Sequence, residues 1–514
     1  MNNSFFYKHL HFILTFIFFL FFAASISFYI GFNRHWTAFA DQELILIYNA
    51  LLFNNGIPIE YTDHPGYFTI LNLSLFYKFL SILNVLPIHK LTLLNTENFD
   101  QSFQNLIFYA RIFSLICFSL FLSSAYFLFN VFTKNKAFSF FSSLALFSFP
   151  GTIFHIGQMR TELIAMIFVI ISISFLKIFF QQKSFGRIWF LVLFFVFLYF
   201  SMLNKMQVFF LYPLFLLPVF FCDHKIYNFN IEKFKFLKNR YFPIFLIFLV
   251  LFYLYISNHT LHPFPWLSTI IILINIFLLN LFFYYIYLNK TEKLIINLVV
   301  INTLFLLIFF IIKNLLILHP STSEIIFINL TRVMDMAMYI PDSPNINETS
   351  DLLRNIILKL IKNSFLIFKN IFFKLDIYCL LIILNIFLTI FLRKKLGKLK
   401  VLFNLSCLFA FLLIIIINSF RSNGSLLAHY EILSDFLLIL SFCNFVNLLK
   451  INYAFIFFVL IFSINFKQNY ETINYYKGKK DDIEFFCRNN FLYHWLKKVD
   501  KNYYLNFCAD NKTR

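Results

Sequence analysis

Long apolar runs, separated by short polar segments, recur along almost the entire chain. An α-helix needs about 20 apolar residues to cross the hydrocarbon core of a membrane, and many of these runs approach that length. We therefore expect an all-α polytopic membrane protein with about 13 transmembrane helices. The approximate spans are Leu10–Ile30, Leu106–Val131, Ala137–Pro150, Glu162–Phe179, Ile188–Met202, Val208–Phe221, Tyr241–Ser257, Trp266–Leu288, Leu294–Ile312, Phe365–Leu392, Val401–Asn418, Leu427–Leu449 and Tyr453–Ile464.

Two long polar segments interrupt this pattern. One follows the first span and covers about residues 31–105, and the other covers about residues 319–364. A polar tail, residues 467–514, follows the last span. We expect one transmembrane domain, residues 1–466, followed by this short tail. Because long loops in compact proteins usually carry function, we expect the chemistry of the protein to reside there.

The first loop contains two predicted helices of its own. One begins at Asp41 and ends at Asn54-Asn55-Gly56, where the glycine is a typical helix stop. This helix is too short to cross a bilayer, so we expect it to lie along the membrane interface. A turn follows at Asp63-His64-Pro65-Gly66. The apolar segment Phe68–Leu86 then predicts a second interfacial or re-entrant helix.

The composition supports a membrane protein. Hydrophobic residues make up 60% of the chain and charged residues 13%, whereas a soluble domain carries about 25% charged residues. The 82 Phe residues are spread along the whole sequence. We interpret most of them as lipid-facing or core side chains and not as an aromatic binding site.

The net charge of +19 comes mainly from Lys and Arg in short segments between spans. Such segments lie on the cytoplasmic side of membrane proteins, which places the N-terminus in the cytoplasm and both long loops and the tail on the outer face. The charge therefore does not indicate a nucleic-acid partner. A second interpretation is attraction to anionic membrane lipids or to phosphate-bearing lipid substrates. The basic segments are Lys134/Lys136, Lys177/Lys183/Arg187, Lys225–Arg240, Lys290/Lys293, Arg393–Lys400 and Lys450.

Asp41 and Glu43 form an acidic pair where the first loop helix begins. One interpretation is structural, with Asp41 as the N-cap and Glu43 as a first-turn partner of the helix dipole. The other is catalytic: a carboxylate removes the proton of an attacking hydroxyl, or orients a metal that does so. Both can be true, because a cap residue can also act as a base.

Asp63 and His64 lie in the turn of the first loop. This segment is either a simple turn or a rigid turn that holds both side chains toward a cleft shared with Asp41. Arg160 and Glu162 open the fourth span. They are either interfacial anchors or a pair in which Arg160 neutralises a phosphate and Glu162 orients it.

Arg421 and His429 precede the twelfth span. They are either interfacial residues or groups that stabilise a leaving phosphate. Their expected position on the same side of the membrane as the acidic pair is what groups all these residues into one candidate site. No clear set of metal ligands stands out.

The acidic pair, the later turn and their place after the first span resemble the integral-membrane GT-C glycosyltransferases. The similar group is the bacterial RgtA/B/C/D-like and protein-mannosyltransferase-like group. Motif similarity covers about residues 40–66, and topology carries the rest of the chain. Two positions depart from the family pattern, because Gln42 separates acids that are usually adjacent and Gly66 replaces a second proline. The matching residues are Asp41/Glu43, Tyr48, Gly56 and Asp63-His64-Pro65-Gly66.

The resemblance implies a glycosyltransferase of the bacterial inner membrane. A lipid-linked sugar donor, a polyprenyl phosphate sugar, enters from the bilayer, and Arg and His residues near the outer face hold its phosphate. Asp41 removes the proton of an acceptor hydroxyl as C1 of the sugar is attacked with inversion. The acceptor is a glycan, a lipid or a protein. The resemblance leaves open whether a divalent metal takes part, and Gln42 leaves open which of Asp41 and Glu43 is the base.

Two other functions compete with this one. A transporter or flippase of a lipid-linked or anionic substrate would also contain intramembrane charges. Such proteins more often show repeated halves and Gly/Pro-broken spans, and this chain has only 9 Gly. We would expect an O-antigen polymerase or ligase to carry its main outer loop later in the chain and no acidic motif after the first span.

Overall fold

The architecture comes from a computed structural model of the whole chain. It describes residues 2–36, 42–60, 66–94, 99–156, 158–181, 187–211, 358, 361–371, 377–419, 431–445, 448 and 451–478. The predicted spans Tyr241–Ser257, Trp266–Leu288 and Leu294–Ile312 lie outside these residues, as does most of the second long loop.

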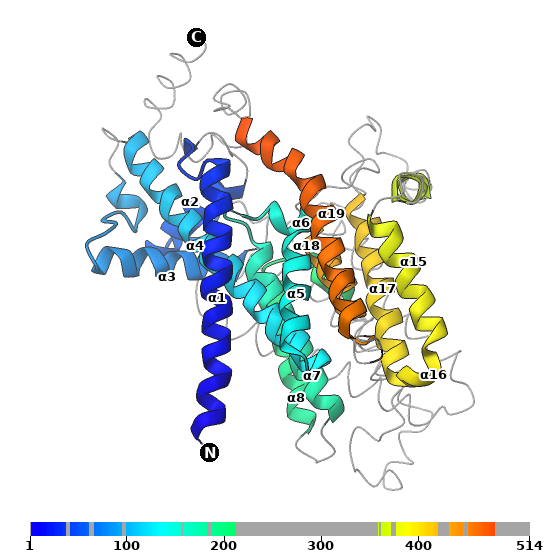
Figure 1. Cartoon of the computed structure of the whole chain (residues 1–514). Helices are drawn as coiled ribbons and strands as arrows, with labels where there is room; N and C mark the ends of the chain where they lie inside the picture. The colour runs from blue at the N-terminus through cyan, green and yellow to red at the C-terminus, as the bar shows by residue number, and fades with distance from the viewer. Residues whose placement is uncertain are drawn as a thin grey trace, which may run out of the picture.

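Helices make up the described part of the chain, and no strand occurs in it (Figure 1). The α-helices and the two short 3-10 helices, η2 and η3, are α1 (Asn2–Ile30), α2 (Gln42–Asn54), α3 (Tyr67–Ile82), η2 (Leu91–Leu93), α4 (Phe99–Thr133), α5 (Lys136–Phe147), α6 (Pro150–Ile153), α7 (Glu162–Gln181), α8 (Arg187–Met202), η3 (Met206–Leu211), α15 (Ile377–Phe391), α16 (Arg393–Leu396), α17 (Lys398–Ser419), α18 (Ile432–Phe442) and α19 (Ile451–Gly478).

Four described segments are long and apolar enough to cross a membrane: Leu10–Ile30, Gln101–Thr133, Glu162–Gln181 and Lys398–Ile415. They match four of the predicted spans to within a few residues, and shorter apolar helices match others. The helical class and the membrane-spanning potential are therefore confirmed. The total of about 13 spans stays a prediction.

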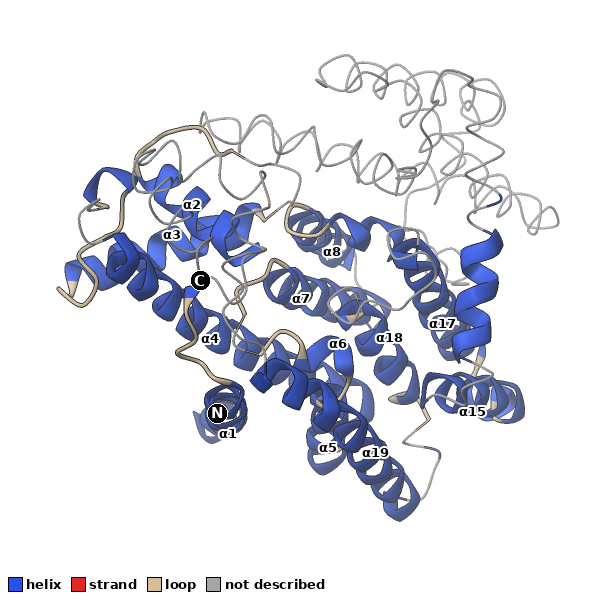
Figure 2. Ribbon diagram, turned by 90° about the horizontal axis from the view of Figure 1, so that it is seen from above, coloured by secondary structure: helices blue, strands red, loops and turns tan. Residues whose placement is uncertain are grey.

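Exposed apolar side chains cover the outer faces of some helices. Phe21 of α1 is 71% exposed and Phe391 of α15 is 73% exposed. Viewed from above, α1 lies at the margin of the described helices, with α7 and α18 toward their middle (Figure 2). Such apolar faces suit contact with lipid better than contact with water, which agrees with our interpretation of the Phe residues.

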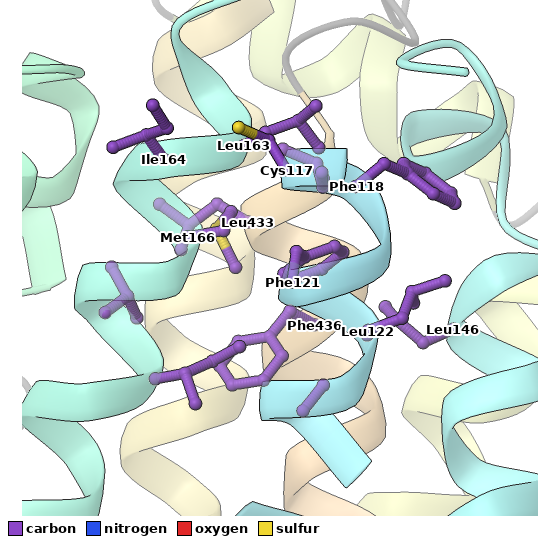
Figure 3. Packing of buried hydrophobic residues seen from close by; sticks show 14 of the residues in the cluster. Cys117, Phe118, Phe121, Leu122, Leu146, Leu163, Ile164, Met166, Leu433 and Phe436 are labelled. Carbon is purple, nitrogen blue, oxygen red and sulfur yellow. The ribbon is translucent and has the colours of Figure 1, made fainter. Parts of the chain in front are cut away.

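The core forms where α4, α5, α7 and α18 meet. Figure 3 shows side chains of these helices gathered in one cluster, with Phe118 and Phe121 of α4 fully buried in it. The rings of Phe129 and Phe436 stack with their centroids 6.0 Å apart, which joins α4 to α18. The short helix α6 lies against the start of α18, since a Cβ on Gly151 would be 2.6 Å from the backbone nitrogen of Ile432.

The first loop contains both predicted helices. Gly56 ends α2 with φ at +70°, and the amide of Ile57 donates to the carbonyl of Leu52 at 3.1 Å, which confirms the predicted helix stop. α3 runs across the direction of α1 (Figure 1), as expected of a helix that does not span. The interfacial position of α2 stays a prediction, but the helix is covered by protein and not exposed on a lipid surface. Residues 43–52 are all buried, because α2 packs against α3 and α4.

Two predicted boundaries differ from the structure. Residues 361–371 are helical but are seen end-on in Figure 1, where α15 is seen from the side, so Phe365–Leu392 is not one straight span. The helix α19 continues past the predicted domain boundary at residue 466 and ends at Gly478. A mixed polar and apolar segment can extend a helix beyond the apolar stretch that reveals it, because the backbone hydrogen bonds do not depend on hydrophobicity.

Candidate functional site at the start of α7

A short buried segment that leads from α6 into α7 makes polar contacts with several other elements. The amide, carbonyl and side-chain groups of residues 158–162 face three other elements, and all five residues are buried. Ser114 of α4 donates its hydroxyl to the carbonyl of Gln158 at 2.5 Å. We refer to residues 158–162 as the α7 entry segment.

Glu43 in the first turn of α2 connects the first loop to this entry segment. Its Oε1 accepts a hydrogen bond from the amide of Met159 at 2.8 Å. Its Oε2 lies 3.3 Å from a guanidinium nitrogen of Arg111 on α4, and both side chains are almost fully buried. The same arginine donates to the carbonyls of Phe32 and Arg34 at 2.9 and 2.8 Å. The carboxylate therefore holds together α2, α4 and the chain that leads into α7.

Tyr77 of α3 lies near the Glu43 carboxylate. Burial, and secondarily the negative charge of Glu43, raise the pKa of Tyr77 well above its usual value. The phenol therefore stays neutral and donates its proton to the carbonyl of Leu106 at 2.9 Å.

Glu162, the first residue of α7, lies between two cations. Its Oε1 accepts from Nζ of Lys205 at 2.6 Å, and its Oε2 lies 3.6 Å from Nε of Arg160. The hydroxyl of Thr161 also donates to Oε2 at 3.3 Å. These contacts assign Glu162 the task of positioning Lys205 and Arg160.

Arg160 is the second buried arginine of the candidate site, and the ion pair with Glu162 engages only part of its guanidinium. It is 4% exposed, and its guanidinium lies over the ring of Phe154 with 5.2 Å to the centroid. Its Nε and Nη2 donate no hydrogen bond to any part of the chain that the structure describes. A planar guanidinium with free donors in a buried setting is well suited to bind a phosphate or carboxylate in bidentate geometry.

The start of α3, just after the predicted Asp63-His64 turn, is fixed beside Lys205. The amide of Tyr67 donates to the carbonyl of Leu203 at 3.2 Å, and the amide of Thr69 donates to Oδ1 of Asn204 at 3.1 Å. On the other side of the turn, the amide of Glu60 donates to Oδ1 of Asn49 at 3.0 Å. Both described flanks of the turn are thus held against α2 and the segment after α8.

Among the predicted site residues, the structure brings Glu43, Arg160 and Glu162 to one place, through the entry segment. The others lie outside the described residues: Asp41, Asp63, His64, Arg421 and His429. Asp41 immediately precedes α2, two residues before Glu43, and Asp63 and His64 lie between the two fixed flanks.

Sequence reasoning passed over Arg111, His155 and Lys205. The signal for Arg111 was available, since an arginine inside an apolar helix is costly to keep and usually has a buried partner. Lys205 carried no local signal, because its significance comes from the ion pair with Glu162, and the burial of His155 beside the entry segment was equally invisible in the sequence. Within the described residues, no group of three or more His, Cys, Asp or Glu side chains could hold a metal ion.

Comparison with known proteins adds no family to this description. No protein-family model, no curated protein and no solved structure matches the chain.

Proposed function

We propose that this protein is a membrane glycosyltransferase, which moves a sugar from a polyprenyl-phosphate donor to an acceptor hydroxyl on the outer face of the membrane. One observation carries the proposal: Arg160, a buried guanidinium with unused donors, follows directly on the Met159 amide that binds Glu43 of the acid-bearing loop. An anion-binding cation thus adjoins the loop that contains the proposed base, which is the pairing that phosphosugar transfer requires.

Each residue then has a distinct role. Asp41 accepts the proton of the acceptor hydroxyl as its oxygen attacks C1 of the sugar. The bond between C1 and the lipid-phosphate oxygen breaks with inversion at C1, and Arg160 stabilises the charge left on the phosphate. Lys205 adds positive charge, and Glu162 holds both cations in place. Glu43 positions the loop, because both of its oxygens are engaged.

The remaining predicted residues support the same cleft. Asp63 and His64 would orient the acceptor, because the flanks of their turn are fixed beside Asn204 and Asn49. Arg421 and His429 would complete the phosphate clamp, because they precede Glu431 at the start of α18, against which α6 packs.

The test is sugar transfer by the purified full-length protein, supplied with a panel of radiolabelled polyprenyl-phosphate sugars and envelope extract as the source of acceptor. We expect Asp41→Asn to lower the rate by about 100-fold or more, because general-base catalysis typically contributes that much. We expect Arg160→Ala to lower the rate and raise the KM for the donor. Arg160→Lys should retain part of the activity, because lysine keeps the positive charge but cannot donate two parallel hydrogen bonds to one phosphate.

Lys78→Ala provides the matched control, because Lys78 is an exposed cation on α3. This variant should transfer sugar at the unaltered rate. Equal activity of the Asp41→Asn, Arg160→Ala and Lys78→Ala proteins would rule out the assigned roles.

One observation favours transport of a lipid-linked or anionic substrate as a second candidate. Glu431 and Asp435 are buried at the start of α18, and the hydroxyl of Tyr378 lies 3.1 and 2.6 Å from their carboxylates. Buried carboxylates in a membrane bundle are typical of transport pathways. The protein can be reconstituted in vesicles that contain a fluorescent polyprenyl-phosphate sugar. Movement of this lipid between leaflets without any transfer product would favour transport over sugar transfer.

A further inference from the structure

A second polar region lies at the other end of α7, far from the candidate site. Lys177 is fifteen residues after Glu162 on this helix, which places the two about 22 Å apart along the axis. Nζ of Lys136, where α5 begins, lies 2.7 Å from His11 near the start of the chain. Figure 1 likewise shows the N-terminus, the end of α7 and α16 at the same end of the bundle.

A pocket opens at this end between α4, α7 and the start of α17, with a volume of about 40 Å³. Lys177 of α7 and Lys400 of α17 both line it, and Asn444, which follows α18, contributes a polar side chain. None of its lining residues is acidic. A pocket with two cations and no carboxylate is arranged for an anion.

Within the part of the chain that the structure describes, the two lysines have no acidic partner. Neither forms an ion pair with a described residue, and Lys400 and Lys134 both repel the charge of Lys177. Nζ of Lys177 instead lies over the ring of Phe132, 4.5 Å from its centroid. Like charges gathered around one half-buried cation raise the free energy of the protein unless an anion joins them.

Asn444, the uncharged polar residue of the lining, is held in place by a buried asparagine behind it. Nδ2 of Asn444 donates to Oδ1 of Asn404 at 2.6 Å. Asn404 is fully buried one turn after Lys400 on α17, and its own Nδ2 has no hydrogen-bond partner among the described residues. The rest of the lining is apolar and includes the stacked rings of Phe132 and Phe403, whose centroids are 5.3 Å apart.

We propose that this pocket binds the phosphate of an anionic membrane lipid. The two lysines and Asn444 recognise the phosphate oxygens, and the stacked rings contact the adjoining acyl chain. A lipid is favoured over a soluble phosphate because the polar and apolar walls lie together near one end of membrane-length helices. The inference is independent of the proposed transfer reaction, since it concerns the opposite end of the bundle.

The test is thermal unfolding of the full-length protein in a neutral detergent, with and without added phosphatidylglycerol. We expect the lipid to raise Tm of the wild type by several degrees, as a ligand that binds only the folded state does. Phosphatidylcholine should give no comparable rise. The double variant Lys177→Gln/Lys400→Gln should lose at least half of the phosphatidylglycerol-dependent shift.

Lys394→Ala/Lys395→Ala provides the matched control, because these exposed cations belong to the neighbouring helix α16 and do not line the pocket. It should keep the full shift. Removing the two pocket lysines also relieves their repulsion, so the lipid-free Tm of the glutamine variant should equal or exceed that of the wild type. A lipid-free Tm well below that of the wild type would contradict the proposed unpaired cations.

Equal lipid-dependent shifts in the pocket and control variants would overturn the proposal. Inorganic phosphate is the second arm. A rise in Tm with phosphate alone as large as that with phosphatidylglycerol would overturn the lipid as the ligand, and no rise with phosphate supports it.

Discussion

Glu43 and Arg160 both belong to the candidate site at the start of α7, but their polar atoms are engaged to different degrees. Glu43 uses one oxygen for the Met159 amide and the other for Arg111. Arg160 keeps two nitrogens without a hydrogen bond in the described structure. An engaged carboxylate is a poor base, because protonation would weaken the contacts that hold it. We therefore expect Asp41 to be the base and Glu43 to be the residue that positions it.

Breaking the Glu43–Arg111 pair should lower the free energy of unfolding by several kcal/mol. Removing one member leaves the other buried and uncompensated, which typically costs about 3–5 kcal/mol. We expect Glu43→Gln and Arg111→Met each to lower the free energy of unfolding by roughly this amount. The double variant should lose less than the sum of the two single losses, because it contains no buried unpaired charge. Denaturant unfolding in mixed micelles measures all three, and strictly additive losses would argue against a direct interaction.

At the scale of elements, α3 begins without a cap of its own. Its N-cap residue is Gly66, which has no side chain to accept a hydrogen bond. Asn204, from the segment after α8, instead accepts from the amide of Thr69, the third residue of the helix. That amide is the one that an N-cap side chain usually satisfies. A residue far away in sequence thus fixes where α3 starts and where the preceding turn is held.

Asn204→Ala should therefore destabilise the start of α3. We expect a loss of about 1–2 kcal/mol, the usual cost of deleting a cap or leaving a buried donor unpaired. Amide hydrogen exchange in residues 67–82 should become faster, and unfolding experiments should report the loss. Asn72→Ala is the control, because the Asn72 side chain donates to the carbonyl of Phe68 in its own helix and, among the described residues, to no other element. Similar exchange rates in both variants would contradict the capping role.

At the scale of the whole molecule, the N-terminus shares one end of the bundle with basic residues of the described segments between helices, among them Lys134, Lys136 and Lys400, and the candidate site lies at the other end. α4 connects the two ends and contains the 33-residue apolar segment Gln101–Thr133. Lys136 at the start of α5 contacts His11, whereas the other end of α4 follows the first loop. Positive charge favours the cytoplasmic side, so we expect the site on the outer face.

Cysteine labelling checks this orientation. Thr92→Cys places an exposed thiol in the first loop, and Ala137→Cys places one at the start of α5. In intact cells, a membrane-impermeant maleimide should label the Thr92→Cys protein above the level of the unsubstituted parent. The Ala137→Cys protein should react only after the membrane is permeabilised. Labelling of both thiols in intact cells, or the reverse pattern, would contradict the predicted topology.

Membrane-spanning helices are predictable from the sequence where an apolar run is long and unbroken. α1, α4, α7 and α17 all match their predicted spans closely, because about 20 apolar residues are stable in lipid only as a helix. The stop of α2 at Gly56 was equally predictable, since its positive φ favours glycine. The environment of α2 was not. The hydrophobic pattern of a short apolar helix is the same whether its surface faces lipid or is covered by other helices such as α3 and α4.

Composition and local pattern are therefore sufficient for the helical class, the potential to span a membrane and the acidic loop after the first span. They are sufficient because hydrophobicity and turn chemistry act between neighbours in the chain. Only the tertiary structure joins Glu43 to Arg111, and Glu162 to Lys205, since these pairs are separated by 68 and 43 residues. Which charges meet, and which donors remain unused, depends on how the helices pack.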